Sequence, residues 1–193
     1  MAVTPWLDPS AQLNGAGWTT PANVYAQDGA NATRTVSGVG VETPYFRIYG
    51  FNSGGTSLAT LVSGATSIDG FEVQWYGRTS NTPQYAYGII GNAPAGSPQT
   101  PAGSEKTIAA AMPVSGTTSA YGTIIGGPTD KWAGKNTGGL VWLPSDLDAN
   151  FGISGAWASN SATMDVVWDH VRMRVYYSVA GGAKSLMMMG VGS

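Results

Sequence analysis

The sequence contains no cysteine and a single histidine, His170. Without cysteine the chain has neither a disulfide framework nor thiolate metal ligands. One histidine is not enough for a histidine-rich metal site. A nucleophilic triad would need that histidine beside a carboxylate, and this chain has few carboxylates. Phosphate-binding and nucleophile-elbow motifs are also missing. We therefore expect no catalytic, cofactor-binding or metal-binding residues, and we interpret His170 as a partly buried or interface residue.

Charged residues are scarce as well, at 10% of the chain against about 25% in ordinary soluble domains. The net charge of −2 provides no basic face, so we expect no nucleic-acid partner. No apolar run approaches the length of a membrane span, and the N-terminus lacks the pattern of a signal peptide. A surface this poor in charge is typical of a protein packed against its own copies or within a larger assembly.

What is abundant is material for a core: 42% of the 193 residues are hydrophobic and seven are tryptophan. The longest strand pattern covers residues 164–179, and its length predicts a central position, since a long free edge invites aggregation. Strict alternation predicts one face with Val167, Val171, Met173, Val175 and Tyr177. It predicts the opposite face with Trp168, His170, Arg172, Arg174 and Tyr176.

Turn signals separate shorter strand patterns along the rest of the chain. These patterns lie near residues 24–25, 32–36, 44–51, 58–62, 68–77, 84–90, 106–111, 121–125, 139–143 and 151–153. Pro144 and Ser145 open a single helical turn between the last two. The sequence therefore predicts one all-β domain, an antiparallel β-sandwich or jelly roll of roughly ten short strands.

Both ends depart from this pattern. Residues 1–14 carry Pro5 and Pro9 and no periodicity, so we expect an N-terminal arm in front of a sandwich of residues 15–180. Residues 181–193 form the expected C-terminal tail, which contains Leu186 and Met187, Met188 and Met189. Trp6 of the arm either docks on a neighbouring molecule or folds back on its own core, and Leu7 is expected to contact a neighbouring molecule.

The acidic residues offer weak alternatives. Asp146 and Asp148 resemble the start of a calcium-binding loop, but the expected glycine and later glutamate are missing. We favour a helix cap made by Ser145 and Asp146, and leave open whether Asp146 and Asp148 bind an ion. Glu42, Glu72 and Asp165 are candidates for a carboxylate pair, although no spacing selects two of them.

Aromatic residues are the stronger feature, because Trp and Tyr serve both as core residues and as interface anchors. Trp75 is in phase with Phe71 and Val73, which predicts a core position. Trp168 is placed by the alternation beside the arginines, as a surface contact with Arg172 stacked nearby. The tryptophans and nine tyrosines also suit a platform on which sugars stack.

Several motifs together resemble a group of small β-sandwich structural proteins of tailed bacteriophages. The resemblance spans most of residues 17–178 and leaves out both ends. Its motifs are Trp18-Thr19-Thr20-Pro21-Ala22-Asn23, Asp28-Gly29-Ala30-Asn31-Ala32, the stretches 65–73, 130–132, 142–147 and 150–153, and the closing run 169–177. It implies a sandwich fold and a structural role, and it implies no catalytic residues.

The expected function is therefore that of a non-enzymatic virion protein, made in the host cytoplasm and located on the phage particle surface. A capsid decoration (cement) protein fits best, with the major capsid protein and further copies of itself, as a homotrimer or other oligomer, as partners. A tail or fibre component and a carbohydrate-binding module are the alternatives. The expected interface residues are Trp6, Leu7, Trp168, His170, Arg172, Arg174, Leu186, Met187, Met188 and Met189.

Overall fold

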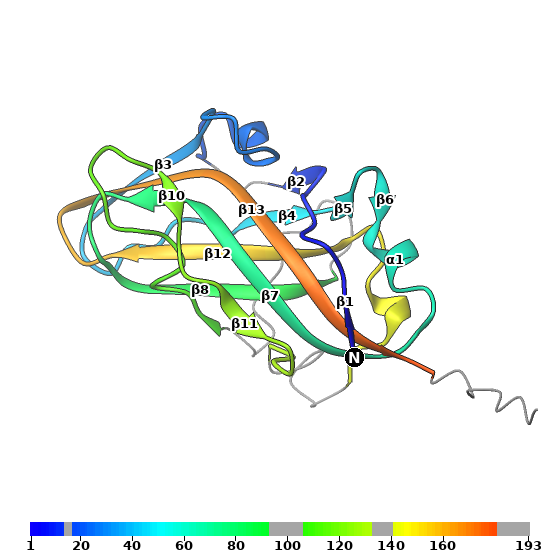
Figure 1. Cartoon of the computed structure of the whole chain (residues 1–193). Coiled ribbons are helices and arrows are strands. Elements are labelled where there is room, and N and C mark those ends of the chain that lie inside the picture. The colour runs from blue at the N-terminus through cyan, green and yellow to red at the C-terminus, as the bar shows by residue number, and fades with distance from the viewer. Residues whose placement is uncertain (14–16, 93–105, 133–140, 181–193) are drawn as a thin grey trace, which may run out of the picture.

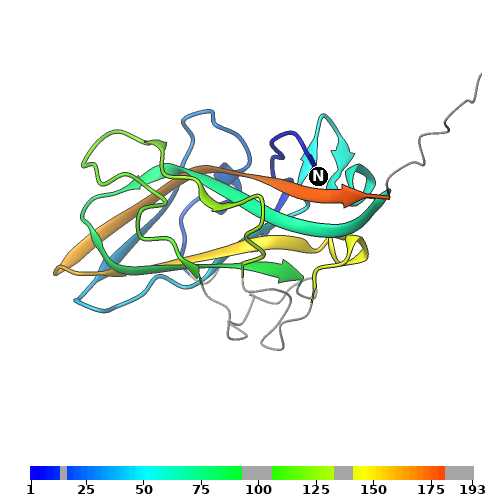
Figure 2. The same ribbon diagram turned by 60° about the horizontal axis from the view of Figure 1, so that its bottom comes forward.

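The computed structural model describes residues 1–13, 17–92, 106–132 and 141–180, and it consists mainly of two antiparallel sheets packed face to face (Figures 1 and 2). We call the sheet that contains β13 the front sheet and the one that contains β12 the back sheet. The predicted all-β sandwich is thus confirmed. No helix among these residues is long and apolar enough to cross a membrane.

The front sheet is built around the two longest strands. β13 pairs with β7 on one side and with β3 and β1 on the other, while β10 and β11 pair with the far edge of β7. The predicted central position of the 164–179 strand is therefore confirmed. The strands are β1 (Ala2–Val3), β3 (Ala32–Ser37), β7 (Ala65–Thr79), β10 (Ala120–Tyr121), β11 (Ile125–Gly127) and β13 (Thr163–Val179).

The back sheet has the order β2-β4-β12-β8-β9. Its strands are β2 (Ala11–Leu13), β4 (Phe46–Tyr49), β8 (Pro83–Asn92), β9 (Lys106–Thr107) and β12 (Phe151–Ser159). A small hairpin, β5 (Asn52–Ser53) and β6 (Thr56–Ser57), and three short helical turns complete the described chain. The turns are η1 (Pro21–Val24), α1 (Leu58–Leu61) and η2 (Pro144–Asp146).

Two of these turns replace expected strands. The strand expected near residues 24–25 is the end of η1, where Pro21 supplies the fixed φ of a first helical position. The apolar run at 58–62 forms α1, whose N-terminus is capped by the Ser57 hydroxyl accepting from the Thr60 N–H at 3.3 Å. Both runs are too short for periodicity to distinguish strand from helix. The helical turn expected at Pro144 is confirmed as η2.

The core between the sheets is aromatic. Trp168 lies at its centre, with its ring centroid 4.9 Å from Phe46, 5.4 Å from Trp157 and 6.4 Å from Trp75. The contacts with Phe46 and Trp157 are edge-to-face pairs, which add stability beyond the buried area. A second cluster joins Phe71 to other rings near η2. The predicted core position of Trp75 is confirmed, since the side chain is fully buried.

The predicted surface position of Trp168 is wrong, because β13 contains a β-bulge. Trp168 is opposite Gly77 and His170 is opposite Tyr76, so Asp169 is an extra residue without a partner on β7. One extra residue reverses the side to which every later side chain points. The core face is therefore Met164, Val166 and Trp168 before the bulge, and Val171, Met173 and Val175 after it.

The predicted N-terminal arm is also corrected, because residues 1–13 belong to both sheets. β1 pairs with β13, Leu7 exchanges two backbone hydrogen bonds with Met173 at 2.7 and 3.1 Å, and β2 pairs with β4. The prolines do not prevent this, since Pro5 and Pro9 fall between the pairing residues, where no ladder N–H is required. Leu7 is fully buried, so it is a core residue.

Candidate functional site

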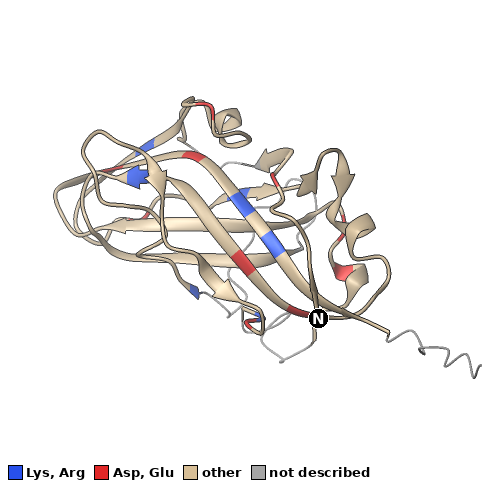
Figure 3. Cartoon of the chain, in the orientation of Figure 1, with Lys and Arg blue, Asp and Glu red and all other residues tan. Residues whose placement is uncertain are grey.

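The outer face of the front sheet carries two arginines directly opposite two acceptors. After the bulge, Arg172 and Arg174 lie on the outward face of β13, and the register places Gln74 and Glu72 of β7 across from them. Figure 3 shows the basic segments of β13 beside an acidic segment of β7. Arg172 donates from Nε and Nη2 to the same Gln74 Oε1, at 3.1 and 2.7 Å. Arg174 forms an ion pair with Glu72, which is largely buried. These cross-strand pairs hold both guanidinium groups in fixed positions.

Aromatic rings from β10, from β13 and from the N-terminal segment between β1 and β2 pack on these guanidinium groups. The Arg172 Cζ lies 4.5 Å from the centre of the Trp6 ring and 4.1 Å from that of Tyr121. The Arg174 Cζ lies 4.7 Å from Trp6 and 5.6 Å from Tyr176. All four distances are within the range of cation–π attraction. We call Trp6, Tyr121, Arg172, Arg174 and Tyr176 the arginine–aromatic surface.

His170 closes one end of this surface. The side chain is 5% exposed, and its Nε2 lies 3.1 Å from the Asp8 carboxylate, which is 60% exposed. Burial lowers the pKa of His170, and the nearby Arg172 lowers it further, although Asp8 acts in the opposite direction. Burial therefore favours the neutral imidazole. In that form the Nε2–H donates to the Asp8 carboxylate, and Nδ1 accepts from the Tyr121 hydroxyl at 3.5 Å.

The structure brings four of the expected interface residues together: Trp6 and His170 lie beside Arg172 and Arg174. Trp168 and Leu7 lie in the core instead. Leu186, Met187, Met188 and Met189 lie outside the described residues, and their role stays a prediction. His170 is buried more deeply than the expected partly buried position, and its interface role also stays a prediction.

Two members of the surface were not among the expected site residues. Tyr176 shares the outward face of β13 with the arginines, a position that simple alternation already indicates. Tyr121 is different, because it reaches the surface only through the pairing of β10 with β7, where it lies opposite Tyr76. Their rings form an edge-to-face pair with centroids 4.9 Å apart. No local pattern around Tyr121 carries that information.

Two acidic residues near η2 accept hydrogen bonds from backbone N–H groups. The Asp146 Oδ2 accepts from the Leu143 N–H at 2.8 Å, as in a helix cap, and the Asp148 Oδ1 accepts from the Asn150 N–H at 2.7 Å. The predicted cap at Asp146 is thus confirmed. Within the described ranges, no three histidine, aspartate or glutamate side chains gather closely enough to hold a metal by themselves.

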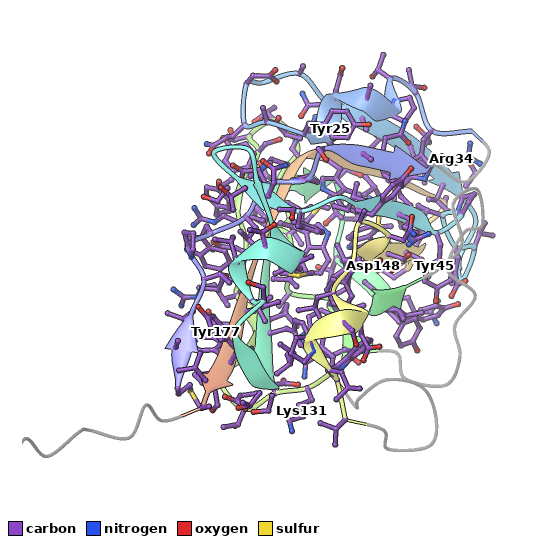
Figure 4. The ribbon with its side chains drawn as sticks, turned by 90° about the vertical axis from the view of Figure 1, so that its right-hand side faces the viewer. Tyr25, Arg34, Tyr45, Lys131, Asp148 and Tyr177 are labelled. Atoms are coloured by element: carbon purple, nitrogen blue, oxygen red, sulfur yellow. The ribbon has the colours of Figure 1, made fainter. Side chains whose placement is uncertain are left out.

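A shallow hollow is lined by residues of α1 and η2. Figure 4 shows these two helical turns near Asp148. It has two adjoining parts of about 530 and 330 Å³, which share Ala59 and Asp148 in their walls. The other lining side chains are mostly small, and Asp148 already accepts a backbone hydrogen bond. The arginine–aromatic surface instead presents aromatic rings together with arginines, which are residue types enriched at binding surfaces.

Comparisons of this chain with protein-family models, with curated proteins and with solved structures found no match. Its function must therefore be argued from its own residues.

Proposed function

We propose that this protein is a non-enzymatic structural protein of a bacteriophage virion, most specifically a capsid decoration protein that binds its neighbours through the arginine–aromatic surface. The observation that carries the proposal is the convergence of Trp6, Tyr121, Tyr176 and two arginines on one sheet face. Trp, Tyr and Arg are the residue types that contribute most of the binding energy at protein interfaces. The sequence resemblance to phage structural proteins supports the virion assignment.

The rigidity of the surface also supports a binding role. The arginines stand on β13 and are fixed by Gln74 and Glu72 of the neighbouring β7, the two longest strands of the sheet. Ordering a flexible side chain on binding costs about 0.5–1.5 kcal/mol. Side chains that are already held by neighbours avoid most of that cost, so the surface is organised before a partner arrives.

The position of the N-terminal segment changes how such a protein would bind. Residues 1–13 are paired within the sandwich, so the contact is made by a sheet face that includes Trp6 and does not require a free N-terminal arm. The partners we propose are the major capsid protein and further copies of this chain, as a homotrimer or other oligomer, on the particle surface. The contribution of residues 181–193 remains part of the proposal.

A particle-binding experiment tests this function. Heads that lack the protein are mixed with purified wild-type chain or with Arg172→Ala, and the bound fraction is measured after sedimentation. We expect at least a tenfold loss of affinity, since interface arginines of this kind cost more than about 1.4 kcal/mol when truncated. Arg34→Ala is the matched control, because Arg34 lies on β3 and donates to the Gly17 carbonyl.

Equal binding by wild type and Arg172→Ala would refute the proposed contact. Light scattering gives a second test, since a protein that stays monomeric at high concentration would contradict the oligomeric part. Binding to isolated tails instead of heads would favour a tail or fibre component.

The partly exposed ring of Trp6 is the observation that keeps a carbohydrate-binding module as the second candidate. A glycan array separates this function from decoration. Specific binding of one glycan class by the wild type, lost in Trp6→Ala, would favour the module. Decoration predicts no specific glycan signal for either protein.

A further inference from the structure

The bulge residue Asp169 is an acidic side chain in an unusual place. It is only 1% exposed, although it lies on the central strand of the front sheet. Its Oδ2 accepts from the Gly29 N–H at 3.3 Å. Its Oδ1 has no hydrogen-bond partner among the described residues. A buried carboxylate oxygen without a partner is costly, so something must compensate for it.

A turn at residues 28–31 packs against this carboxylate, beside β13 in Figure 1. Gly29 adopts a φ of +83°, and the Asp28 Oδ1 accepts from the Ala30 N–H at 2.9 Å. The Asn31 Nδ2 donates to the Gly29 carbonyl at 2.9 Å, which identifies the other amide atom as the oxygen. That Oδ1 is buried and also has no partner among the described residues.

The strand register keeps these groups together. β3 begins at Ala32, which is opposite Trp168 on β13, so Asn31 and Asp169 are the next residues along the two neighbouring strands. Both side chains bond to Gly29, Asp169 through its N–H and Asn31 through its carbonyl. Two side chains that bond to the same glycine of this turn therefore each carry a buried oxygen atom with no partner among the described residues.

Among the residues that the structure describes, the Asp169 carboxylate has no cationic partner. Two carboxylates and an amide oxygen thus lie at one turn, and no lysine or arginine of the described ranges forms an ion pair with either carboxylate.

We propose that Asp169, Asn31 and Asp28 bind a divalent cation of the calcium class, which fastens the 28–31 turn to β13. Calcium prefers carboxylate and amide oxygens and completes its six to eight ligands with water. The Asp169 and Asn31 Oδ1 atoms provide two such ligands, and the exposed Asp28 side chain adds a second negative charge. The bound ion would give both buried oxygen atoms the partner that none of the described residues supplies.

Calcium titration of the full chain tests this site. Protein freed of metal with a chelator and dialysed is titrated with CaCl₂ by calorimetry, and its Tm is measured with and without CaCl₂. We expect one saturable site, with a Kd of about 10⁻⁴–10⁻³ M, as in sites with few charged ligands, and a Tm that rises with calcium. MgCl₂ should raise the Tm less, because magnesium demands stricter geometry.

Two substitutions locate the ion. Asp169→Asn keeps the shape but removes the buried charge, and should weaken calcium binding at least tenfold. Asp165→Asn is the matched control on the same strand, because Asp165 accepts from the Thr35 hydroxyl, and its calcium affinity should equal that of wild type. Asn31→Asp adds a third carboxylate, so it should lower the Tm in chelator and bind calcium more tightly.

Several results would overturn the site. Wild-type protein that shows neither binding heat nor a Tm change at about 10 mM CaCl₂, ten times the weakest expected Kd, has no such site. If Asp169→Asn binds calcium with the affinity of the wild type, the ion lies elsewhere. If Asp169→Asn does not fold, an unchanged calcium affinity in Asn31→Asp leads to the same conclusion. These outcomes are independent of particle binding, so they leave the proposed function untouched.

Discussion

Replacing Leu7 by alanine tests whether the N-terminal segment is part of the sandwich. Leu7 is fully exposed to solvent if residues 1–14 form a free arm, but its side chain is completely buried in the structure. Its backbone bonds to Met173 do not involve the side chain, so an alanine keeps them. The substitution therefore removes only the buried part of the side chain and leaves a cavity.

The size of the effect follows from that burial. Leu→Ala substitutions at fully buried sites lower the free energy of unfolding by about 3–5 kcal/mol, according to how far the site collapses. Leu7 lies on a segment at the edge of the front sheet, where relaxation is easier, so we expect a loss near 3 kcal/mol. A typical domain has a total stability of only about 5–15 kcal/mol, so the loss would be readily measured.

Guanidinium unfolding followed by tryptophan fluorescence measures this loss. Val3→Ala is the control on the same segment, because Val3 is 46% exposed, and it should change stability by less than about 0.5 kcal/mol. A loss below about 1 kcal/mol for Leu7→Ala would refute the reasoning, since a buried leucine cannot be truncated so cheaply. Residues 1–8 would then be a detachable arm.

Three further substitutions test the core, a close backbone contact and a cap. Trp168→Ala should lower the free energy of unfolding by about 3–5 kcal/mol. A loss under about 1 kcal/mol would contradict the buried position of Trp168. Gly152→Ala should be strongly destabilising, because the added Cβ would lie 2.1 Å from a backbone oxygen of β4. Gly64→Ala is the control and should be tolerated, because its Cβ would have no neighbouring atom within 4 Å. Equal stability of the two variants would contradict the close backbone contact at Gly152. Asp146→Ala should cost about 1 kcal/mol through loss of its bond to a backbone N–H, and an unchanged midpoint in urea would contradict the cap.

The parts of the fold that the sequence predicts are those with local signals. In the run at 68–77 apolar and polar residues alternate with a period of two, which indicates a strand and not a helix. The run lies within β7. Pro144 and Ser145 predict η2 because proline fixes the first helical φ and a nearby carboxylate caps the turn. In both cases the residues of the element itself carry the signal that predicts it.

The bulge could not be placed by assuming strict alternation, although the sequence carries a trace of it. Met164, Val166 and Trp168 are apolar at even positions, and Val171, Met173 and Val175 at odd ones. The change of phase falls on the polar pair at 169–170, where the extra residue lies. Reading the whole run as one period therefore assigned Trp168 to the wrong face.

The N-terminal segment and Tyr121 were missed for a different reason, because tertiary contacts alone define them. Residues 1–13 pair in pieces of one to three residues with strands of both sheets, which is too short for any period to appear. Tyr121 belongs to the two-residue strand β10. Such pieces acquire their structure from the long strands that they join, so local propensity has little influence on them.

The bulge at Asp169 connects the core of this protein to its candidate interface. In an unbroken strand, Trp168, Arg172 and Arg174 would share one face. That face would either expose Trp168 to water or bury two guanidinium groups in the core, and burying unpaired charges is the more costly outcome. The extra residue avoids both, since Trp168 packs inward while the arginines reach Trp6 and Tyr121 on the outside. A surface that binds through fixed arginines is compatible with this aromatic core only because β13 changes phase between them.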